Sequence, residues 1–363
     1  MNNHARRIVA LAVIAGAYFS SNLDLLAADE ESRAATAARA KDPGWKPSAV
    51  EAGSIKIGDA RSSVALNNFC LNAEGNILAC VASNGTARNG ENASGIRVYS
   101  PNGKLLKTLP LEIKPAAICV AKDGSIFVAG EGRLLKLDAD GKVLASAASP
   151  VAAVPVVITK EIEEMMKQTK RSGEAEIQRM KTRLEQRRAD VTGLAATDED
   201  VFIAVPTPGE FTYQVHRFDH ALQNSKLVVE KLRGCCGQMD IQAHAAKLWI
   251  PHNGRHSVEV RDRDGNSLSK FGTKGKVKAE DFGGCCEPKN MRVLANGDVL
   301  VAESGPPTCI KRFSADGKFL GVVAVVNEKA DCVRVTVEMT PDASTFYMLD
   351  TKNNAIRVFT TKG

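Results

Sequence analysis

The sequence lacks the patterns that most directly mark an enzyme or a nucleic-acid-binding protein. It contains no nucleophile elbow, no paired-carboxylate signature, no phosphate-binding loop and no thioredoxin-type Cys-x-x-Cys. The formal net charge is only +6 over 363 residues. Basic and acidic residues are interspersed, so there is no basic stripe of the kind that nucleic-acid binding requires. These absences favour a non-catalytic protein with no nucleic-acid partner.

Long apolar runs are scarce as well, because no segment after the N-terminus reaches the ~20 apolar residues that span a bilayer. Residues 1–28 place Arg6 and Arg7 before an apolar run from Ile8 to Phe19, and small residues follow. This order predicts a signal peptide or a short uncleaved anchor. We therefore expect a secreted or periplasmic protein that contacts a membrane only if the anchor is retained. Residues 29–52, which are broken by prolines and a glycine, predict a flexible linker.

The sequence does contain an internal repeat of about 45 to 50 residues, a period typical of propeller blades. The clearest copies start with a turn glycine and an apolar run, and continue through a loop, an alternating segment, an Asp-Gly turn and another short apolar segment. The copies are Gly75–Leu111, Gly124–Ala148, a degenerate Val201–Val229, Lys247–Gly272, Gly297–Val323 and Thr345–Gly363.

Short alternating runs separated by such turns predict small antiparallel sheets of four strands. A single sheet cannot bury both faces, and a closed ring of sheets buries them all and protects the edges. We therefore predict an all-β, six-bladed β-propeller over residues 53–363. The last copy stops after its third strand, and Ser54–Gly58 supplies an unattached strand. We expect this N-terminal strand to complete the last blade.

Two stretches resemble the NHL repeat. They are LDTKNNAIRVF (Leu349–Phe359) and the longer KFGTKGKVKAEDFGGCCEPKNMRVLANGDVLVAES (Lys270–Ser304), with its Phe-Gly opening and Asn-Gly turn. The resemblance, to exported bacterial-type members of that family, also implies a six-bladed propeller. NHL propellers include binding scaffolds and a few enzymes that hold zinc with histidines from several blades. This chain departs from the zinc pattern, since His244, His252 and His256 all fall in one blade.

Residues 159–190 break the repeat between blades two and three. Apolar residues recur there at helical spacing, and charged residues fill the other faces. The apolar positions are Ile162, Met165, Met166, Ile177, Met180 and Leu184. The pattern predicts a helical insertion of two helices separated near Gly173. We expect the apolar stripe to pack on the propeller, and a lid or partner-binding role is the alternative.

Nine cysteines in an exported chain predict disulfides, and the odd number leaves at least one thiol over. Two adjacent pairs occur, Cys235–Cys236 and Cys285–Cys286. The repeat alignment places Cys235, Cys285 and Cys332 at one equivalent position in the loops that enter blades four, five and six. Cys309, His252 and His256 fall in other loops at the same end of the ring. The sequence therefore predicts one face that gathers cysteines and histidines.

Three interpretations of these cysteines remain open. The first is cross-linking between blades, for example Cys309 with Cys332, which would stabilise the ring. The second is a strained vicinal disulfide within each pair, where flanking glycines supply a permissive backbone. The third is a zinc or copper site made of thiolates with His252 or His256. Cys70, Cys80 and Cys119 fall in strands, which predicts buried thiols or a Cys70–Cys80 bridge.

Polar residues near the cysteine pairs are the candidate ligand-binding residues. We expect one group to line the central channel: Asp240, Gln242, Glu287, Lys289, Asn290 and Arg292. His252, Asn253, Arg255 and His256 form a polar run that resembles a ligand-facing loop, whereas His216 and His220 are predicted to be exposed. The sequence predicts a non-catalytic scaffold that binds a ligand or protein partner on this face. The alternatives are a zinc- or copper-dependent lyase or hydrolase, or a protein that handles thiols or metals.

Overall fold

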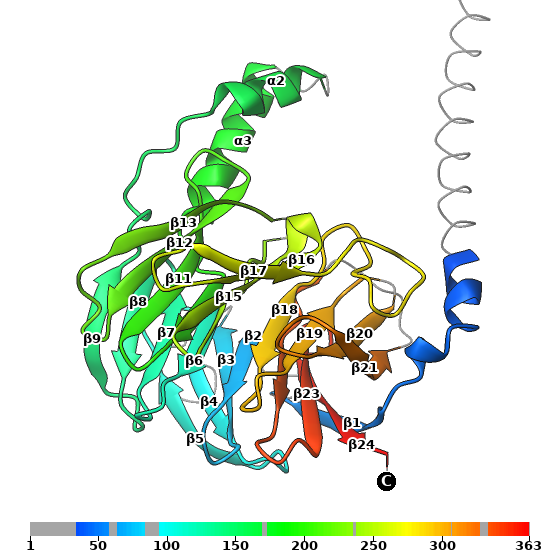
Figure 1. Ribbon diagram of the computed structural model, residues 1–363. Helices are drawn as coiled ribbons and strands as arrows, with labels where there is room; N and C mark the ends of the chain where they lie inside the picture. Colours follow the sequence, from blue (N-terminus) through cyan, green and yellow to red (C-terminus); the bar gives the residue numbers. More distant parts are fainter. Residues whose placement is uncertain are drawn as a thin grey trace, which may run out of the picture.

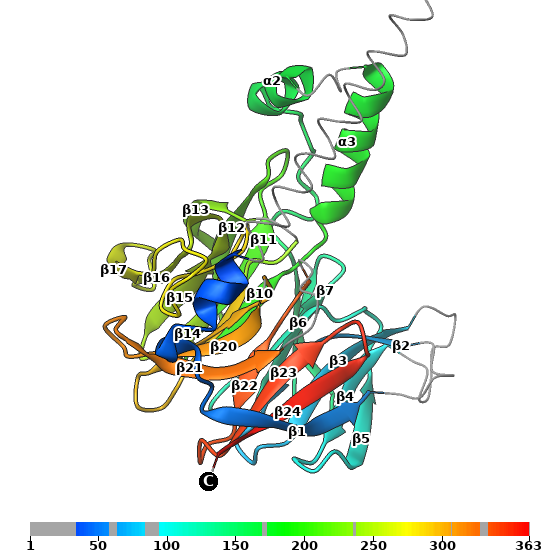
Figure 2. The same cartoon turned by 90° about the vertical axis from the view of Figure 1, so that its right-hand side faces the viewer.

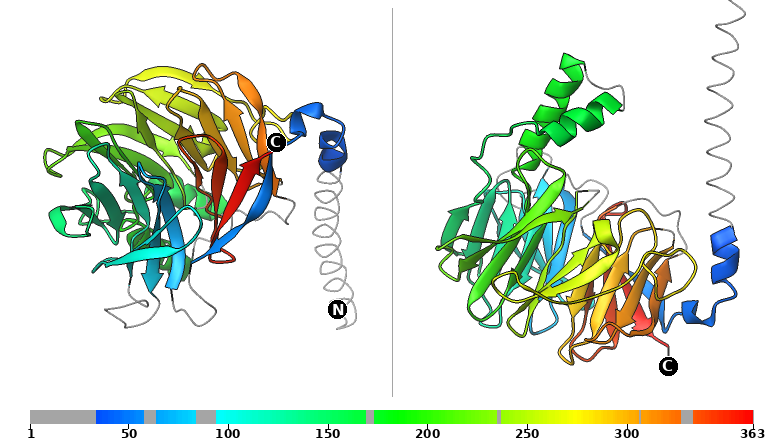
Figure 3. Two further views of the ribbon diagram at one scale, coloured as in Figure 1. Left: turned by 90° about the horizontal axis from the view of Figure 1, so that it is seen from below. Right: turned by 45° about the horizontal axis from the view of Figure 1, so that its top comes forward.

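The computed structural model is a six-bladed β-propeller in which each blade is a four-stranded antiparallel sheet (Figure 1). It describes residues 34–57, 64–83, 94–168, 173–234, 237–305, 307–326 and 333–362. The blades are arranged radially, as the view from below shows (Figure 3). Of the helices in these ranges, none combines the length and hydrophobicity needed to cross a bilayer. The predicted fold class is therefore confirmed.

In blades 1 to 5 the strands follow chain order from the axis outward, and in blade 6 the N-terminal strand β1 is outermost. Blade 1 contains β2 (Val64–Leu71), β3 (Ile77–Ser83), β4 (Gly95–Tyr99) and β5 (Leu105–Pro110). Blade 2 contains β6 (Ala117–Val120), β7 (Ile126–Gly130), β8 (Arg133–Leu137) and β9 (Val143–Ala148). Blade 3 contains β10 (Gly193–Ala196), β11 (Asp200–Pro206), β12 (Thr212–Asp219) and β13 (Lys226–Arg233).

The remaining three blades complete the ring. Blade 4 contains β14 (Gln242–His244), β15 (Lys247–His252), β16 (Ser257–Arg261) and β17 (Ser267–Phe271). Blade 5 contains β18 (Asn290–Val293), β19 (Val299–Glu303), β20 (Thr308–Phe313) and β21 (Phe319–Val326). Blade 6 contains β22 (Val337–Met339), β23 (Thr345–Asp350), β24 (Ala355–Thr361) and β1 (Ala49–Lys56). The first strands of neighbouring blades contact one another all around the ring, so they line its axis.

Strand β1 closes the ring by pairing antiparallel with β24, with Ile55 opposite Ile356. The predicted closing strand is thus present, and it starts at Ala49, five positions before the alternating segment. Asn354 reinforces the closure because its side-chain amide donates to the carbonyls of Ile57 and Val64, at 2.7 and 3.1 Å. Its Oδ1 accepts from the amide of Leu66 at 2.6 Å. One side chain therefore links the first strand of the ring to its last blade.

The tight turns between third and fourth strands pack against the preceding blade. Gly317 has φ +88°, and a Cβ there would lie 2.3 Å from Cβ of Phe271 in blade 4. Gly265 has φ +89°, and a Cβ there would lie 1.8 Å from the carbonyl oxygen of Val228 in blade 3. Only glycine satisfies both the backbone conformation and the close approach. The Asp-Gly turns therefore permit the blades to stack as well as reversing the chain.

The insertion between blades 2 and 3 is a helical hairpin of α2 (Lys160–Gln168) and α3 (Glu174–Arg187). Figures 1 and 2 show it standing off the ring. Its apolar stripe packs between the two helices and on Val156, Ile158 and Phe211, so only its base touches the propeller. The expectation that the stripe lies on the propeller therefore holds only at the base, and Met165 is 38% exposed.

Residues before β1 also contact the ring. A helical segment at residues 34–39 leads to the 3-10 helix η1 (Pro43–Trp45). The indole nitrogen of Trp45 donates to the carbonyl of Val277 at 2.7 Å. The Lys311 ammonium lies 5.0 Å from the centre of the Trp45 ring. Much of the segment predicted as a linker thus packs beside blade 5.

Candidate functional site

The segments that carry the two cysteine pairs contact the same loop at one end of the ring. We call this end, which includes Gly234, residues 252–256 and Gly284, the cysteine rim. This loop is the 3-10 helix η2 (Asn253–Arg255) with its flanking histidines, between β15 and β16. The amide of Arg233, next to Gly234, donates to Nε2 of His252 at 2.9 Å. Nε2 of His256 donates to the carbonyl of Gly284 at 3.4 Å. Gly234 and Gly284 therefore lie at a shared rim, while Cys235 and Cys236 are outside the described residues.

The sulfur atoms of Cys285 and Cys286 are not bonded to each other. They lie 3.1 Å apart, whereas a disulfide bond is about 2.05 Å long. The vicinal interpretation is therefore wrong for this pair in the state described. Cys285 is exposed, and the Lys289 ammonium lies 2.9 Å from Sγ of buried Cys286. Cys286 is not among the free thiols, and a cross-link from it to another blade stays a prediction.

Cys309 does not form the bridge to Cys332 that the sequence suggested. It is a buried free thiol in strand β20, opposite Glu303 in the sheet. Burial, together with the nearby Glu303 carboxylate, raises the pKa of this thiol well above its usual range. Cys332 itself lies outside the described residues. Cys309 is thus a core residue and not a rim cross-link.

Glu287 joins two loops of blade 5 from inside the protein. Its Oε1 accepts from the amide and hydroxyl of Ser304, at 3.0 and 2.9 Å, and from the amide of Gly305 at 2.8 Å. Its Oε2 is buried without a hydrogen-bond partner. Burial, and then the nearby Glu303 carboxylate, raise the Glu287 pKa to about 8. The Glu287 carboxyl group therefore holds two loops together and does not line the channel.

The polar run from His252 to His256 is mostly buried, so it does not face a ligand as a unit. His252 donates from Nδ1 to Glu259 at 2.7 Å, and Asn253 donates to the carbonyl of Gln238 at 2.6 Å. The His252 bond is the main cause that lowers the Glu259 pKa to about 2. Only Arg255 of the four polar candidates is exposed. Both ring nitrogens of His252 are occupied by protein atoms.

Three of the predicted channel residues do come together. Asn290 donates to Oδ2 of Asp240 at 2.5 Å, and Arg292 lies 3.3 Å from the same oxygen. Arg292 also donates to Glu338 of blade 6 at 2.6 Å. Burial raises the pKa of both carboxyl groups, and Arg292 opposes this shift. The arginine pKa is raised because both carboxyl groups outweigh its burial.

Arg334, which was not among the residues predicted from the sequence, crosses the channel at the cysteine-rim end. Its guanidinium donates to the carbonyls of Ala116 in blade 2 and Thr192 in blade 3, at 2.9 and 3.3 Å. Burial lowers its pKa. Neighbouring bonds complete a belt across the blades: Gln238 with Val335, Thr336 with Asn68, and Val337 with Asn290. The channel end is therefore spanned by protein side chains.

A signal for this belt was present in the repeat alignment. Asn290 begins β18 and Thr336 directly precedes β22, so both polar residues stand where the first strands of their blades start, while Asn68 lies within β2. The remaining predicted residues play smaller parts. Gln242 is half-buried and donates to the neighbouring Ile241 carbonyl, and His216 is buried against Gln214 instead of exposed.

Cys70, Cys80 and Cys119 are free thiols, so the suggested Cys70–Cys80 bridge is absent. Burial raises the Cys119 pKa to about 12, so these thiols stay protonated at neutral pH. Across the described ranges, no group of three or more His, Cys, Asp or Glu residues is placed to hold a metal ion. A zinc or copper site stays a prediction.

Neither a protein-family model nor a curated protein matches the sequence. Solved structures do match the fold. A gluconolactonase from Xanthomonas campestris is 12% identical with a TM-score of 0.52, and the match covers 87% of this chain and 99% of that one. A protein of unknown function from Bacteroides thetaiotaomicron is also 12% identical with a TM-score of 0.52, covering 85% and 76%. At this identity the likeness establishes a six-bladed β-propeller, and the NHL resemblance stays a prediction.

Proposed function

We propose that this protein is an exported, non-catalytic propeller scaffold that binds an acidic protein partner on the cysteine rim. The observation that carries the proposal is a group of exposed basic side chains on a rigid, internally bonded base. Arg233 and Arg255 are both exposed, and neither makes an ion pair with the described residues. Lys274 is exposed as well, and its charge contributes to lowering the pKa of His256, whose burial is the main cause.

The base under these side chains is held by buried polar contacts. His252 and His256 tie η2 to both cysteine-pair segments, and Glu287 ties the entry loop of blade 5 to the loop after β19. Loops fixed in this way lose little conformational freedom when a partner binds. Exposed guanidinium groups favour carboxylates, which they bind in a fork geometry.

The channel offers less support for catalysis. Asp240 and Glu338, the carboxyl groups beside the axis, both contact Arg292, and Arg334 spans the channel end above them. The gluconolactonase likeness is one of fold. We therefore infer a binding role, in which the helical hairpin at the same end offers additional surface.

The test compares two double charge reversals. Arg233→Glu with Arg255→Glu alters the rim, whereas Lys104→Glu with Lys142→Glu alters exposed lysines at the opposite end of the ring. Proteins of the native extract are cross-linked to each form and quantified by mass spectrometry. We expect one acidic protein to cross-link near Lys274 of the wild type and the control, with at least a tenfold loss for the rim variant. Equal recovery by both variants would contradict the proposal.

A further inference from the structure

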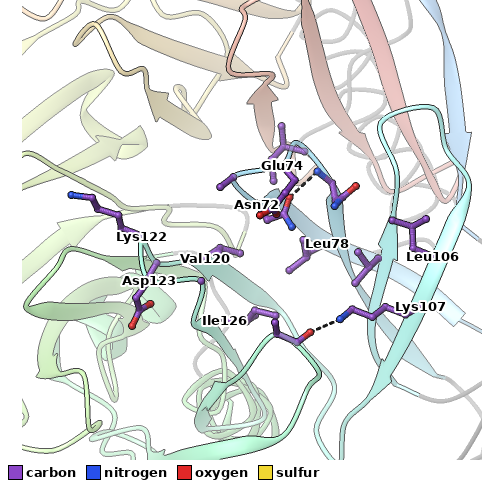
Figure 4. Close-up of a pocket in the computed structure, with 16 residues that line it drawn as sticks. Asn72, Glu74, Leu78, Leu106, Lys107, Val120, Lys122, Asp123 and Ile126 are labelled. Atoms are coloured by element: carbon purple, nitrogen blue, oxygen red, sulfur yellow. Dashed lines mark hydrogen bonds between the residues drawn. The ribbon is translucent and has the colours of Figure 1, made fainter.

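A cavity opens between blades 1 and 2 at the end of the ring opposite the cysteine rim (Figure 4). Its volume is about 760 Å³, within the range of small-molecule sites. The turns that follow β2 and β6 form its mouth, and strand residues of both blades form its floor. The face predicted from the sequence to bind a ligand lies at the other end of the ring.

Among the described residues, the core cluster in this gap contains no aromatic ring, unlike the clusters in the other gaps between blades. The clusters in the five other gaps between blades contain Phe346 and Phe359, Phe127 and Phe218, Phe69 and Tyr347, Phe202 and Tyr213, or Trp249, Phe282 and Phe313. The cluster between blades 1 and 2 is built from aliphatic side chains and two cysteines. Because aromatic rings supply the largest apolar volume, their absence leaves this wedge unfilled.

The neighbouring gap, between blades 2 and 3, contains aromatic rings and has a smaller cavity. The gap between blades 2 and 3 holds about 340 Å³, lined by Lys122, Asp123, Thr197, Asp198 and His220. There the rings of Phe127 and His220 pack edge to face, 5.4 Å apart. The gap between blades 1 and 2, which lacks such ring packing, therefore has the larger cavity.

The floor and the mouth differ in chemistry. Leu78, Val98 and Ile126 on the floor are buried and apolar. At the outer edge, Lys107 donates to the carbonyl of Ala139 at 2.5 Å and so joins the two blades. This bond is visible in Figure 4.

The cavity lining contains two lysines, Lys107 and Lys122, and two carboxylates, Glu74 and Asp123, and both lysines pair with carboxylates outside the lining. The Lys107 ammonium is paired with Asp140 at 3.2 Å, and Lys122 lies 3.8 Å from Asp198 and extends away from the other lining side chains. Glu74 lines the mouth, and none of the described basic residues makes an ion pair with it. A group entering beside Glu74 would therefore be favoured if it carried positive charge.

We propose that this cavity binds a small aromatic molecule bearing a cationic amine. The ring lies on Leu78, Val98 and Ile126, in the wedge that aromatic side chains fill between the other blades. The amine lies at the mouth, beside the Glu74 carboxylate. This site goes beyond the proposed partner binding, because it is at the opposite end of the ring and uses none of the rim residues.

The test uses three probes of one ring system: tryptamine, indole and indole-3-acetate. Binding to the full chain is measured by calorimetry and by saturation-transfer NMR. We expect tryptamine to bind with a dissociation constant below about 1 mM, a range typical of molecules of this size. Indole should bind several-fold more weakly, and indole-3-acetate most weakly. Failure of all three to saturate the protein would overturn the proposal.

Two variants block the cavity and one serves as their control. Val120→Phe adds a ring at the end of β6, and Leu106→Trp adds one from the half-exposed strand β5, so at least one should fold normally. Each should weaken tryptamine binding at least tenfold. Leu144→Phe adds a ring to an exposed position of β9 outside the cavity and should leave binding unchanged. Unchanged binding in a folded blocking variant would overturn the proposal.

Glu74→Gln tests the charge preference. It should reduce the affinity ratio of tryptamine to indole-3-acetate at least threefold while leaving indole binding within a factor of two. An unchanged ratio would show that Glu74 does not select the amine and would contradict the proposed ligand class.

Discussion

Glu287 shows how one buried carboxyl group can hold two loops together. The carboxyl accepts three hydrogen bonds through one oxygen, while the other oxygen has no partner. Such a group is most easily accommodated in its protonated form, because burial penalises the charge. Its raised pKa of about 8 follows from this placement.

This placement predicts a dependence of stability on pH. Between pH 4.5 and about 8 the folded protein keeps a proton that the unfolded chain releases. The free energy of unfolding should therefore fall as pH rises through this window, with a slope approaching about 1.4 kcal/mol per pH unit. Glu287→Gln keeps an acceptor for Ser304 and Gly305 but cannot ionise, so its unfolding free energy should change less. Urea unfolding at pH 5, 6.5 and 8 measures the difference.

The matched control is Glu230→Gln, because Glu230 is exposed on β13. It should retain the wild-type slope. If Glu287→Gln and the wild type showed the same slope, the carboxyl of Glu287 would have to be ionised in the folded protein.

The roles of single residues at the rim were only partly predictable from the sequence. The alignment placed His252, Asn253 and Glu287 at the correct end of the ring. The alignment could not show that these three side chains point into the protein, because they bond to backbone groups of other loops, up to 19 positions away. Arg255 has no such partner and remains exposed.

Among the elements, the helical hairpin is the least integrated into the ring. It has its own small core of Val156, Ile162, Met166 and Leu184. Its base is attached by few contacts, among them the Arg188 guanidinium with the Val154 carbonyl at 2.9 Å. An element with few buried contacts opens at a lower free energy than the rest of the protein.

We therefore expect Leu184→Ala to act on the hairpin alone. Removing a buried leucine side chain costs about 2 kcal/mol or more, and here the loss should appear as weaker hydrogen-exchange protection of α2 and α3. Protection of strands in blades 4 and 5 should not change. Gln186→Ala, at an exposed position of the same helix, is the control. Loss of protection throughout the ring would show that the hairpin and the propeller unfold as one unit.

Elements were more predictable than the packing between them. Period-two alternation and turn glycines predicted the strands. The last repeat lacked a fourth strand and the N-terminus had a spare one, which predicted the closure by β1. The aliphatic gap between blades 1 and 2 was not predicted, because each strand there has the ordinary pattern. This gap differs from the others in the total side-chain volume that the two facing blades contribute. The periodicity of a single strand carries no information about that total.

At the scale of the whole molecule, the side chain of Asn354 reinforces the closure of the ring. Asn354 joins Ile57, Val64 and Leu66 through three hydrogen bonds. Its backbone is in the left-handed region, with φ +50°, which asparagine tolerates better than most residues. A polar side chain with three partners in a half-buried site should contribute to the stability of the whole ring.

Asn354→Ala should therefore lower the free energy of unfolding by about 2 kcal/mol or more. Asn353→Ala is the control, because Asn353 is exposed and, among the residues that the structure describes, its side chain bonds only to Asp350. It should change the unfolding free energy by less than about 1 kcal/mol. Both values come from urea denaturation followed by circular dichroism. Equal effects of the two substitutions would mean that the closure does not limit stability.

Closure by β1 also sets an order of events during synthesis. Glu51 and its partner Arg357 are 306 positions apart, so β1 leaves the ribosome long before β24 exists. At ordinary translation rates the delay is about 15 to 60 s. Throughout that time β1 is an unpaired edge that could associate with other nascent chains. Most of its residues are exposed even after folding, and they include Glu51 and Lys56. These charges would keep β1 soluble until β24 has been synthesised.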